Sequence, residues 1–549
     1  MSNRPPFSSF LYLWAVLFVC WLIYLGWVIW DIGLDRFNLP FTLEGMLFGV
    51  VSAGVLSLAL YSVAWGAKAV SQMLKPGPEV RGVGAWLVDG QVERQHEVLE
   101  IKAAGLGVHD VQQSNIWRLI KQTSDNFVSV LAPDAHPYPD SVQGRRKIAA
   151  NNVRVAYRNS AGDAVGLWPV PTFALGPPKQ PEHIGAAANI TAGRNAAYLG
   201  VTLFVWQEAQ NTTHAQGMLE KLFQFFDENP DVPQALLVSE DGDFVRNGYR
   251  PAGTPAMEDG HALPKVFESM TGLLLSRSDR VDKYLRASAP DHGQNDANRK
   301  VESDRFVEFF WQRYFDYNAT YSGQYNPDQP ETPRSPALMS SGWWHAQLPV
   351  FWRTFANYGP GLYKPSPWLP VRWDKLQLDE FDSAPLLGYL HRPVKRSMTD
   401  ENGQRLKLAL QIQTMQELWL DALATLPKSA APVRVFYDST DNLELGVALA
   451  NALHVLNTDG SGIETTNPQE GFDLGRRLGD TGVSSALVAI NVATMASYLD
   501  GGISAVVYMG SDESVTVQMV RPPDDLRRAE NALTRGPDPF VFRIYGTAP

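Results

Sequence analysis

Two long uncharged stretches close to the N-terminus constrain this sequence most. Residues 10–30 read FLYLWAVLFVCWLIYLGWVIW, without a charged side chain, and residues 46–67 form a second uncharged stretch. A helix rises about 1.5 Å per residue, so each stretch is long enough to cross the hydrocarbon core of a bilayer, which is roughly 30 Å thick. We therefore expect residues 1–75 to form a membrane anchor with two transmembrane helices, 10–30 and 46–67.

A cleaved signal peptide is the competing interpretation of residues 10–30. Signal peptides usually have an apolar region of about 7–15 residues behind several positive charges, and they end in a small-residue cleavage site. Here the apolar stretch is longer, only Arg4 precedes it, and no such site lies before Asp31. The sequence therefore favours a retained membrane helix.

Basic residues behind the second stretch indicate how the anchor is oriented. The connection 31–45 contains three acidic residues and one arginine, whereas the chain after residue 67 carries Lys68, Lys75 and Arg81. Basic flanks stay on the cytoplasmic side of the membrane. We expect a multi-pass protein of a bacterial inner membrane, with the N-terminus and the C-terminus both in the cytoplasm.

The rest of the chain has the composition of a folded protein. Apolar residues make up 45% and charged residues 19% of the sequence, which is far from the profile of disordered chains. The formal net charge is −11 and no run of Lys or Arg occurs, so a nucleic-acid partner is not expected. The single cysteine, Cys20, lies in the first hydrophobic stretch. This excludes a disulfide framework, a cysteine zinc site and a thiol nucleophile from the remainder.

Two successive α/β domains with mixed sheets are expected behind the anchor. In the first domain, 76–320, the strand-like runs 199–206 and 235–239 flank a helical stripe at 216–228. Strand, helix and strand in this order predict a parallel βαβ unit. The polar region 291–336, rich in Asn, Asp, Gln and Pro, marks the boundary to the next domain.

The second domain, 321–549, again alternates helices and strands. Its expected elements are a helix at 406–426, a strand at 433–437, a helix at 443–456, and a hairpin of 503–509 with 515–520. Residues 484–499 are apolar nearly all round. This stretch is short and contains Asn491, so we expect a buried helix rather than a third membrane span.

Local motifs for catalysis are absent. The sequence has no G-x-S-x-G pentapeptide, no G-x-x-x-x-G-K-[ST] phosphate loop, no G-x-G-x-x-G turn and no H-E-x-x-H helix. We expect no catalytic residue, no cofactor and no metal site. Because hydrolase triads can form without a local signature, a membrane-associated hydrolase of the lipase or esterase kind with an unorthodox site is kept as the alternative.

Three polar places are weaker candidates for chemistry. Residues 438–441 (DSTD) follow a strand, where open α/β sheets bind ligands, but Asp441 and Glu444 have the spacing of a helix N-cap. Residues 240–243 (EDGD) could bind a divalent ion, yet a solvated turn explains them better. His345, beside two tryptophans, is expected to be a packed or surface histidine.

The segment 342–373 is unusually rich in aromatic residues. It contains five tryptophans, two tyrosines and two phenylalanines. Aromatic and Arg side chains dominate interface hot spots, although filling the core between the two domains is the stronger interpretation and a ligand groove is the weakest. The candidates for partner binding are Trp343, Trp344, Trp352, Arg353, Trp368 and Arg372.

The layout of the chain resembles the bacterial type VI lipase adapter protein family. The resemblance rests on the hydrophobic N-terminus, the two α/β portions, and the segments GWWHAQLPVFWRTFANYGPGLYKPSPW (342–368) and GFDLGRRLGDTGVSSALVAINVATMASYLDGG (471–502). It implies a non-enzymatic role: recruiting a phospholipase-type toxin to the spike of the type VI secretion apparatus before firing. No functional residue is carried over from the family.

The sequence therefore leads us to expect a membrane-anchored, non-enzymatic adapter. Its expected partners are a phospholipase-type effector, a secretion spike protein, and the membrane through two helices. The alternatives are the hydrolase described above and a structural component of an envelope complex. Ser, His and Asp side chains within hydrogen-bond reach in one pocket would favour the hydrolase.

Overall fold

The computed structural model describes residues 98–541, apart from 124–126, 178–181, 201, 208–213, 251–252, 292–301, 322–337, 355–362, 441, 458–461 and 511. The expected membrane helices 10–30 and 46–67, and the orientation inferred from their flanks, lie outside the described residues. Within the described part, one helix, Gly482–Asp500, is long and apolar enough to cross a membrane, and 78% of it is buried inside the molecule.

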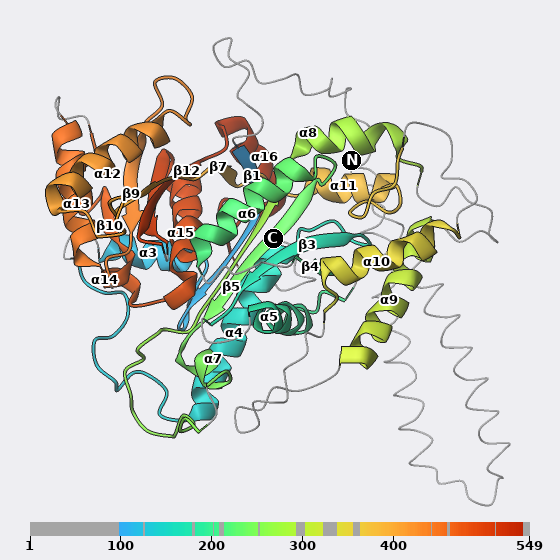
Figure 1. Ribbon diagram of the computed structural model, residues 1–549, viewed down its shortest axis with the longest axis horizontal. Coiled ribbons are helices and arrows are strands. Elements are labelled where there is room, and N and C mark those ends of the chain that lie inside the picture. Colours follow the sequence, from blue (N-terminus) through green and yellow to red (C-terminus); the bar gives the residue numbers. More distant parts are fainter. Residues whose placement is uncertain are drawn as a thin grey trace, which may run out of the picture. The chain divides into compact units, whose positions relative to one another are not determined.

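Twelve strands of the described chain form one mixed sheet. Their order is β10-β9-β11-β12-β7-β1-β6-β5-β3-β4, with β2 paired to β1 and β8 paired to β12. The strands are β1 (Val98–Val108), β2 (Val111–Gln112), β3 (Pro169–Leu175), β4 (Leu203–Trp206), β5 (Gln234–Asp241), β6 (Ser269–Ser276), β7 (Gly388–His391), β8 (Val394–Ser397), β9 (Pro432–Tyr437), β10 (Gly471–Asp473), β11 (Ile503–Met509) and β12 (Ser514–Arg521). Figure 1 shows β9, β10 and β12, in orange and red, to one side of the strands of the first half, as the order of the sheet requires.

The two halves of the sheet repeat one topology. The first half runs β1-α4-β3-α5-β4-α6-β5-β6 and the second runs β7-α12-β9-α13-β10-α15-β11-β12. If the five strands of each half are counted along the chain, they lie in the sheet in the order first, fifth, fourth, second, third. The fourth, second and third strands are parallel to one another. The matching helices are α4 (Val142–Ala161) and α12 (Leu408–Leu423), α5 (Glu182–Ala196) and α13 (Leu443–Leu456), and α6 (Ala215–Glu228) and α15 (Ser485–Asp500).

The remaining helices lie between or after the elements of this repeat in the sequence. They are α3 (Ser114–Gln122), α7 (Asp243–Asn247), α8 (Ser278–Arg280), α9 (Glu302–Tyr321), α10 (Ser341–Trp352), α11 (Lys375–Ser383), α14 (Leu474–Leu478), α16 (Asp525–Arg535), and the short turns η4 (Val281–Leu285), η5 (Arg286–Ser288) and η6 (Gly482–Ser484). The expected α/β class, the parallel unit built on β4, α6 and β5, and the terminal hairpin β11–β12 are confirmed. The domain limits 76–320 and 321–549 stay a prediction, and β1 and β7, which belong to different halves, are hydrogen-bonded neighbours.

Helix α15 explains why residues 484–499 are apolar all round. It contacts β6 and β1 of the first half, β11 and β12 of the second half, and its counterpart α6. Thirteen of its side chains are buried, so almost every face of the helix meets protein. The expectation of a buried helix is confirmed, and Asn491 and Thr494 satisfy hydrogen-bonding groups by donating to carbonyl oxygens one turn back.

Two glycines let helix α4 lie directly against the sheet. A Cβ atom on Gly105 would stand 1.8 Å from the carbonyl oxygen of Ala156, and one on Gly272 would stand 2.1 Å from Ser160 Oγ. Real Cβ atoms cannot approach so closely, so strands β1 and β6 need glycine where they cross this helix. This close packing fixes α4, one wall of the pocket described below.

Candidate functional site

The aromatic segment begins with a capped helix. Ser340 accepts a hydrogen bond from the backbone N–H of Trp343 at 3.3 Å, which satisfies a free amide in the first turn of α10. Helix α10 then packs on α9, where the rings of Phe306 and Phe310 lie 5.8 and 5.4 Å from the ring of Trp344. Residues 306–317, an aromatic run within the polar region 291–336, thus belong to α9.

Helix α9 in turn covers α5 of the first half. Arg194 of α5 is buried, donates a hydrogen bond to the Tyr314 hydroxyl at 2.9 Å, and lies 5.3 Å from the ring centre of Trp311. A guanidinium against aromatic faces is a favourable way to bury a cation. The aromatic segment is thus attached to the sheet through α9.

The structure separates the six partner-binding candidates into two groups. Trp344 and Trp368 are 0% and 3% exposed and belong to the main core. The indole N–H of Trp368 donates to Asn229 Oδ1 at 3.1 Å, and Arg372 forms an ion pair with Glu302 at 2.6 Å. These three residues hold the fold together, so they can influence a partner only through the position of the segment.

The other three candidates lie at the surface of α10. Trp343 and Trp352 are half-buried and Arg353 is exposed. Beside them runs the outer face of α10, which consists of Gly342, Ala346, Pro349, Val350 and Arg353, all exposed. This face carries no charge before Arg353 and could contact a protein partner without desolvating an ion. His345 is half-buried, with its ring 4.8 Å from that of Trp368, as expected for a packed histidine.

The polar groups after strand β9 are engaged in structural hydrogen bonds. Ser439 donates to Asp473 Oδ2 at 2.5 Å, while Thr440 and Ser485 both donate to the Asp438 carboxylate. The cap of helix α13 is Asn442, whose side chain accepts from the N–H of Leu445 at 3.1 Å. We predicted the cap at Asp441, one residue before its actual position. The sequence could not distinguish the two residues, because Asn and Asp are about equally good caps. Asp441 itself lies outside the described residues.

The acidic segment 240–243 is not the solvated turn that we expected. Asp241 is 0% exposed and binds Arg246 through two hydrogen bonds of 2.7 and 2.8 Å. Asp243 accepts from the backbone N–H groups of Lys265 and Val266. Both carboxylates therefore stabilise the fold. The residues that the structure describes contain no group of three His, Cys, Asp or Glu placed to hold a metal ion.

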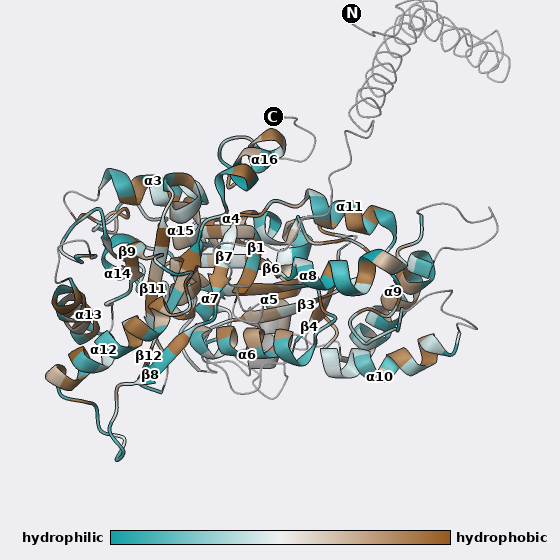
Figure 2. Ribbon diagram, turned by 90° about the horizontal axis from the view of Figure 1, so that it is seen from above, coloured by the Kyte–Doolittle hydropathy of each residue, from teal (hydrophilic) through white to brown (hydrophobic). Residues whose placement is uncertain are grey.

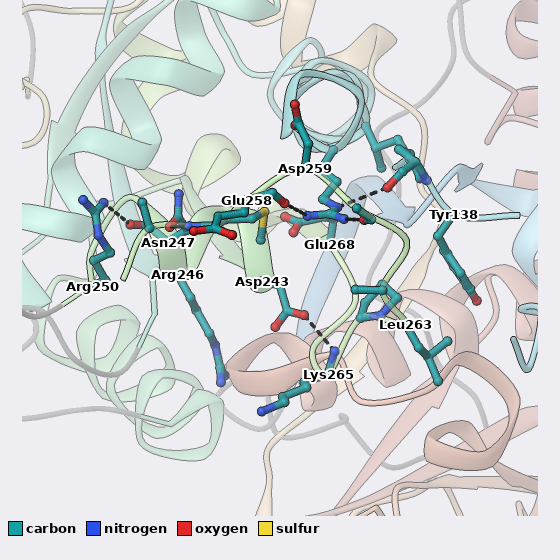
Figure 3. A pocket seen from close by; sticks show the side chains of 18 of the residues that line it. Tyr138, Asp243, Arg246, Asn247, Arg250, Glu258, Asp259, Leu263, Lys265 and Glu268 are labelled. Atoms are coloured by element: carbon teal, nitrogen blue, oxygen red, sulfur yellow. Dashed lines mark hydrogen bonds between the residues drawn. The ribbon is translucent and has the colours of Figure 1, made fainter. Parts of the chain in front are cut away.

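The same acidic segment borders a pocket that sequence reasoning missed. The pocket has a volume of about 740 Å³, within the range of small-molecule sites, and is lined by α4, α7 and the loop 254–265. Arg145 of α4 donates to the carbonyl oxygens of Glu258 and Gly260, and Asn247 Oδ1 accepts from the N–H of Met257 at 2.8 Å. These bonds, some of them dashed in Figure 3, hold the loop over the pocket.

Two titratable side chains at the base of the pocket are buried without complete pairing. Glu268 accepts from the N–H of Phe244 at 2.5 Å through Oε1, but its Oε2 has no hydrogen-bond partner. Burial raises the pKa of the Glu268 carboxyl to about 8. The backbone N–H of His109 donates to the carbonyl oxygen of Glu268 at 2.6 Å, while the ring nitrogen Nδ1 has no hydrogen-bond partner. Burial lowers the pKa of the His109 imidazole. Both groups are therefore uncharged at neutral pH.

The described residues that line the pocket include no serine or cysteine, the usual nucleophiles of hydrolases. The signal in the sequence was a single Glu directly before the apolar strand β6, which a search for spaced motifs does not detect. The pocket does contain one carboxyl group, that of Glu268, whose protonation should affect the stability of the fold.

Glu268 should make the stability of the protein depend on pH. Its pKa is higher in the folded chain than the usual 4.5, so the stabilisation by its proton is complete below pH 4.5 and disappears as pH rises to about 8. Glu268→Gln should remove this slope. At about 1.4 kcal/mol per pH unit, the difference in unfolding free energy between the two proteins should change by at most about 5 kcal/mol. Urea unfolding of the purified protein between pH 5 and 9 measures it, and parallel pH curves would contradict the assignment.

Comparison with known proteins assigns both halves of the repeat to one family. The model of the type VI lipase adapter protein Tla3, N-terminal, matches residues 97–259, and that of its C-terminal part matches residues 387–522. Among solved structures, the ketosynthase from module 1 of the bacillaene synthase of Bacillus amyloliquefaciens FZB42 has 9% sequence identity and a TM-score of 0.38, covering 79% of this chain and 77% of that chain. The ishigamide ketosynthase/chain length factor has 11% identity and a TM-score of 0.37, covering 78% of this chain and 100% of that chain. The two family matches together span more than half of the sequence, and the chain belongs to the type VI lipase adapter protein family.

Proposed function

We propose that this chain is a non-enzymatic adapter that binds a phospholipase-type toxin and loads it onto the spike of the type VI secretion apparatus. The observation that carries the proposal is the match of both halves to the lipase adapter family. We further propose that the two hydrophobic stretches, 10–30 and 46–67, hold the protein in a bacterial inner membrane with both termini in the cytoplasm. The charges flanking these stretches support this orientation.

The outer face of α10, together with Trp343 and Trp352, is the proposed contact for the toxin. Val350 on this face is 49% exposed, and Arg353 lies beside it at the end of the helix. An apolar patch with a neighbouring tryptophan and arginine has the composition of an interface hot spot. The core below it, built on Trp344, gives the patch a rigid support.

The proposed absence of catalysis is supported by how the polar groups are used. The best catalytic candidate, Asp438, already accepts hydrogen bonds from Thr440 and Ser485. These bonds orient the carboxylate toward groups of its own chain. The runner-up, a hydrolase with an unorthodox site, would have to use the lone pairs of Asp438 that remain free.

Surface and core residues of the aromatic segment should respond differently to mutation. Val350→Asp and Arg353→Ala should each weaken binding of a purified phospholipase-type toxin by about 2 kcal/mol or more, roughly 30-fold in Kd, with little change in Tm. Trp344→Ala should instead cost about 3–5 kcal/mol of folding stability, because it empties a core site. Titration calorimetry and thermal unfolding measure the two effects, with the 52% exposed Leu420→Ala as the surface control. If both surface variants bind the toxin with the Kd of the unmodified protein, α10 does not form the interface.

The purified protein should not turn over ester or phospholipid substrates above the rate of a buffer blank. The reason is that the hydroxyl groups at the best catalytic candidate, Ser439 and Ser485, donate to the Asp473 and Asp438 carboxylates rather than to a histidine base. A fluorogenic phospholipid assay in detergent tests this expectation. Turnover that disappears in Asp438→Ala, while the protein remains folded, would establish the hydrolase alternative.

A periplasmic reporter should detect the proposed topology. Alkaline phosphatase, which is active only outside the cytoplasm, should be inactive when fused after Pro549 and active when inserted in the connection 31–45. Replacing Lys68, Lys75 and Arg81 together by Asn should weaken this pattern, since these residues supply the cytoplasmic charge bias. The opposite activities in the two fusions would refute the cytoplasmic placement.

A further inference from the structure

The pocket under the loop 254–265, which we call the Glu268 pocket, lies where α/β sheets usually hold ligands. Strands β1, β3 and β5 run in one direction, because β6 is antiparallel to both β1 and β5, and β5 is parallel to β3. The chain lines the pocket just after each of these strands, at His109, Pro177 and Asp243. Ligands of open α/β sheets bind outside the carboxyl ends of the strands, so the pocket has the position of a binding site.

Two unpaired polar atoms belong to side chains at the base of the Glu268 pocket. The ladder of β1 and β6 ends with the pair Val108 and Ser269. The next residues, His109 and Glu268, are joined by a backbone hydrogen bond, and both line the pocket while only 7% and 6% exposed. Glu268 Oε2 and His109 Nδ1 have no hydrogen-bond partner. Burying such atoms unpaired costs free energy, which a ligand that pairs with them would recover.

The surroundings of Glu268 favour a cation over an anion. Burial raises the pKa of the Glu268 carboxyl, and so do the negative charges of Glu240 and Asp243 (Figure 3). Charges that disfavour a carboxylate at this place also repel an anionic ligand and attract a cationic one. The arginines beside the pocket do not pair with Glu268, because Arg246 is bound to another carboxylate and Arg145 donates to backbone carbonyl oxygens.

An ammonium group matches the two unpaired atoms better than a metal ion does. Within the part of the chain that the structure describes, no three His, Cys, Asp or Glu side chains are placed to hold a metal. An ammonium has three N–H donors and no acceptor. It can donate to Glu268 Oε2 and to His109 Nδ1, because burial favours the neutral imidazole, which can carry its proton on the other nitrogen. Tyr138, whose ring lies 4.7 Å from that of His109, adds an aromatic ring to the same lining.

We propose that the Glu268 pocket binds a small organic molecule through a primary ammonium group, which pairs with Glu268 Oε2 and His109 Nδ1. The volume of about 740 Å³ is that of a small-molecule site and leaves space for the remainder of such a ligand. The loop that covers the pocket is exposed along nearly all of its length, so a ligand can enter without disturbing the sheet. The described lining includes no residue of the aromatic segment 342–373, and the inference therefore goes beyond the adapter role.

Binding of an ammonium ion should release a proton from the protein. In the free protein Glu268 is protonated at pH 7, because its pKa is about 8. An ammonium ion at Oε2 stabilises the carboxylate, so Glu268 gives its proton to the solvent while the amine keeps its charge. At pH 7 about nine-tenths of a proton should leave for each amine that binds.

The test is a calorimetric titration of the purified full-length protein at pH 7 with three probes of one length: butylamine, 1-butanol and butyrate. Butylamine should bind one molecule per chain, whereas the neutral and the anionic probe should bind at least tenfold more weakly. Titrations in two buffers with different heats of ionisation measure the released proton. They should show it for butylamine alone.

Two variants connect this binding to Glu268. Glu268→Gln keeps a neutral side chain of the same shape but cannot form the ion pair, so the Kd for butylamine should rise at least tenfold and the proton release should disappear. Glu401→Gln replaces an exposed glutamate in the turn between β8 and α12. This control should bind butylamine like the unmodified protein.

Five results would overturn the proposal: no binding of butylamine, equal binding of 1-butanol, tighter binding of butyrate, binding without proton release, or a Kd that Glu268→Gln does not change. Thermal unfolding shows whether Glu268→Gln remains folded. If it does not, the proton released by the unmodified protein still decides the question. None of these results depends on the toxin, so they leave the adapter proposal untouched.

Discussion

The antiparallel pairing of β1 with β7 joins the two halves of this protein, and the other features rest on it. Residues 98–101 of β1 pair with residues 388–391 of β7, so a single sheet passes from one half to the other. Helix α15 packs under this junction and contacts strands of both halves. At the end of β7, His391 is fully buried, and burial lowers its pKa to about 3. A neutral imidazole can stay inside the junction without a carboxylate partner.

The repeat makes the differences between the halves informative. Helix α5 in the first half is covered by the aromatic helix α9, through Arg194 and Tyr314. Its counterpart α13 in the second half is coloured largely brown in Figure 2, yet Leu443 and Val455 are 66% and 56% exposed. The aromatic segment between the halves thus completes the first half only. Within this segment Trp344 and Trp368 lie in the core, whereas Trp343 and Trp352 are half-buried.

Much of the fold could be predicted from local patterns. The helical stripe at 216–228 and the apolar run at 484–499 became α6 and α15, because hydrophobic periodicity reports directly on burial. The single sheet could not be predicted, because pairing of β1 with β7 joins residues far apart in sequence and neither strand has a signature for its partner. The site was harder still. Glu268 belongs to a pocket only because a distant loop folds over it. Trp343 and Trp344 differ only in the side of α10 that each occupies, which the sequence does not reveal.

The junction between β1 and β7 has a consequence for synthesis of the protein. Strand β1 emerges from the ribosome early, and β6 can pair with one of its edges. On the other edge, β2 pairs with residues 107–108, whereas residues 98–101 lack their described partner until residues 388–391 have been made. An unpaired strand edge readily binds other chains, and non-local pairings form slowly. The nascent first half must therefore wait with a reactive edge while more than a hundred further residues are translated, and helix α15, which seals the junction, follows later still. During translation, the first half is therefore more prone to aggregation than its well-packed final core would suggest.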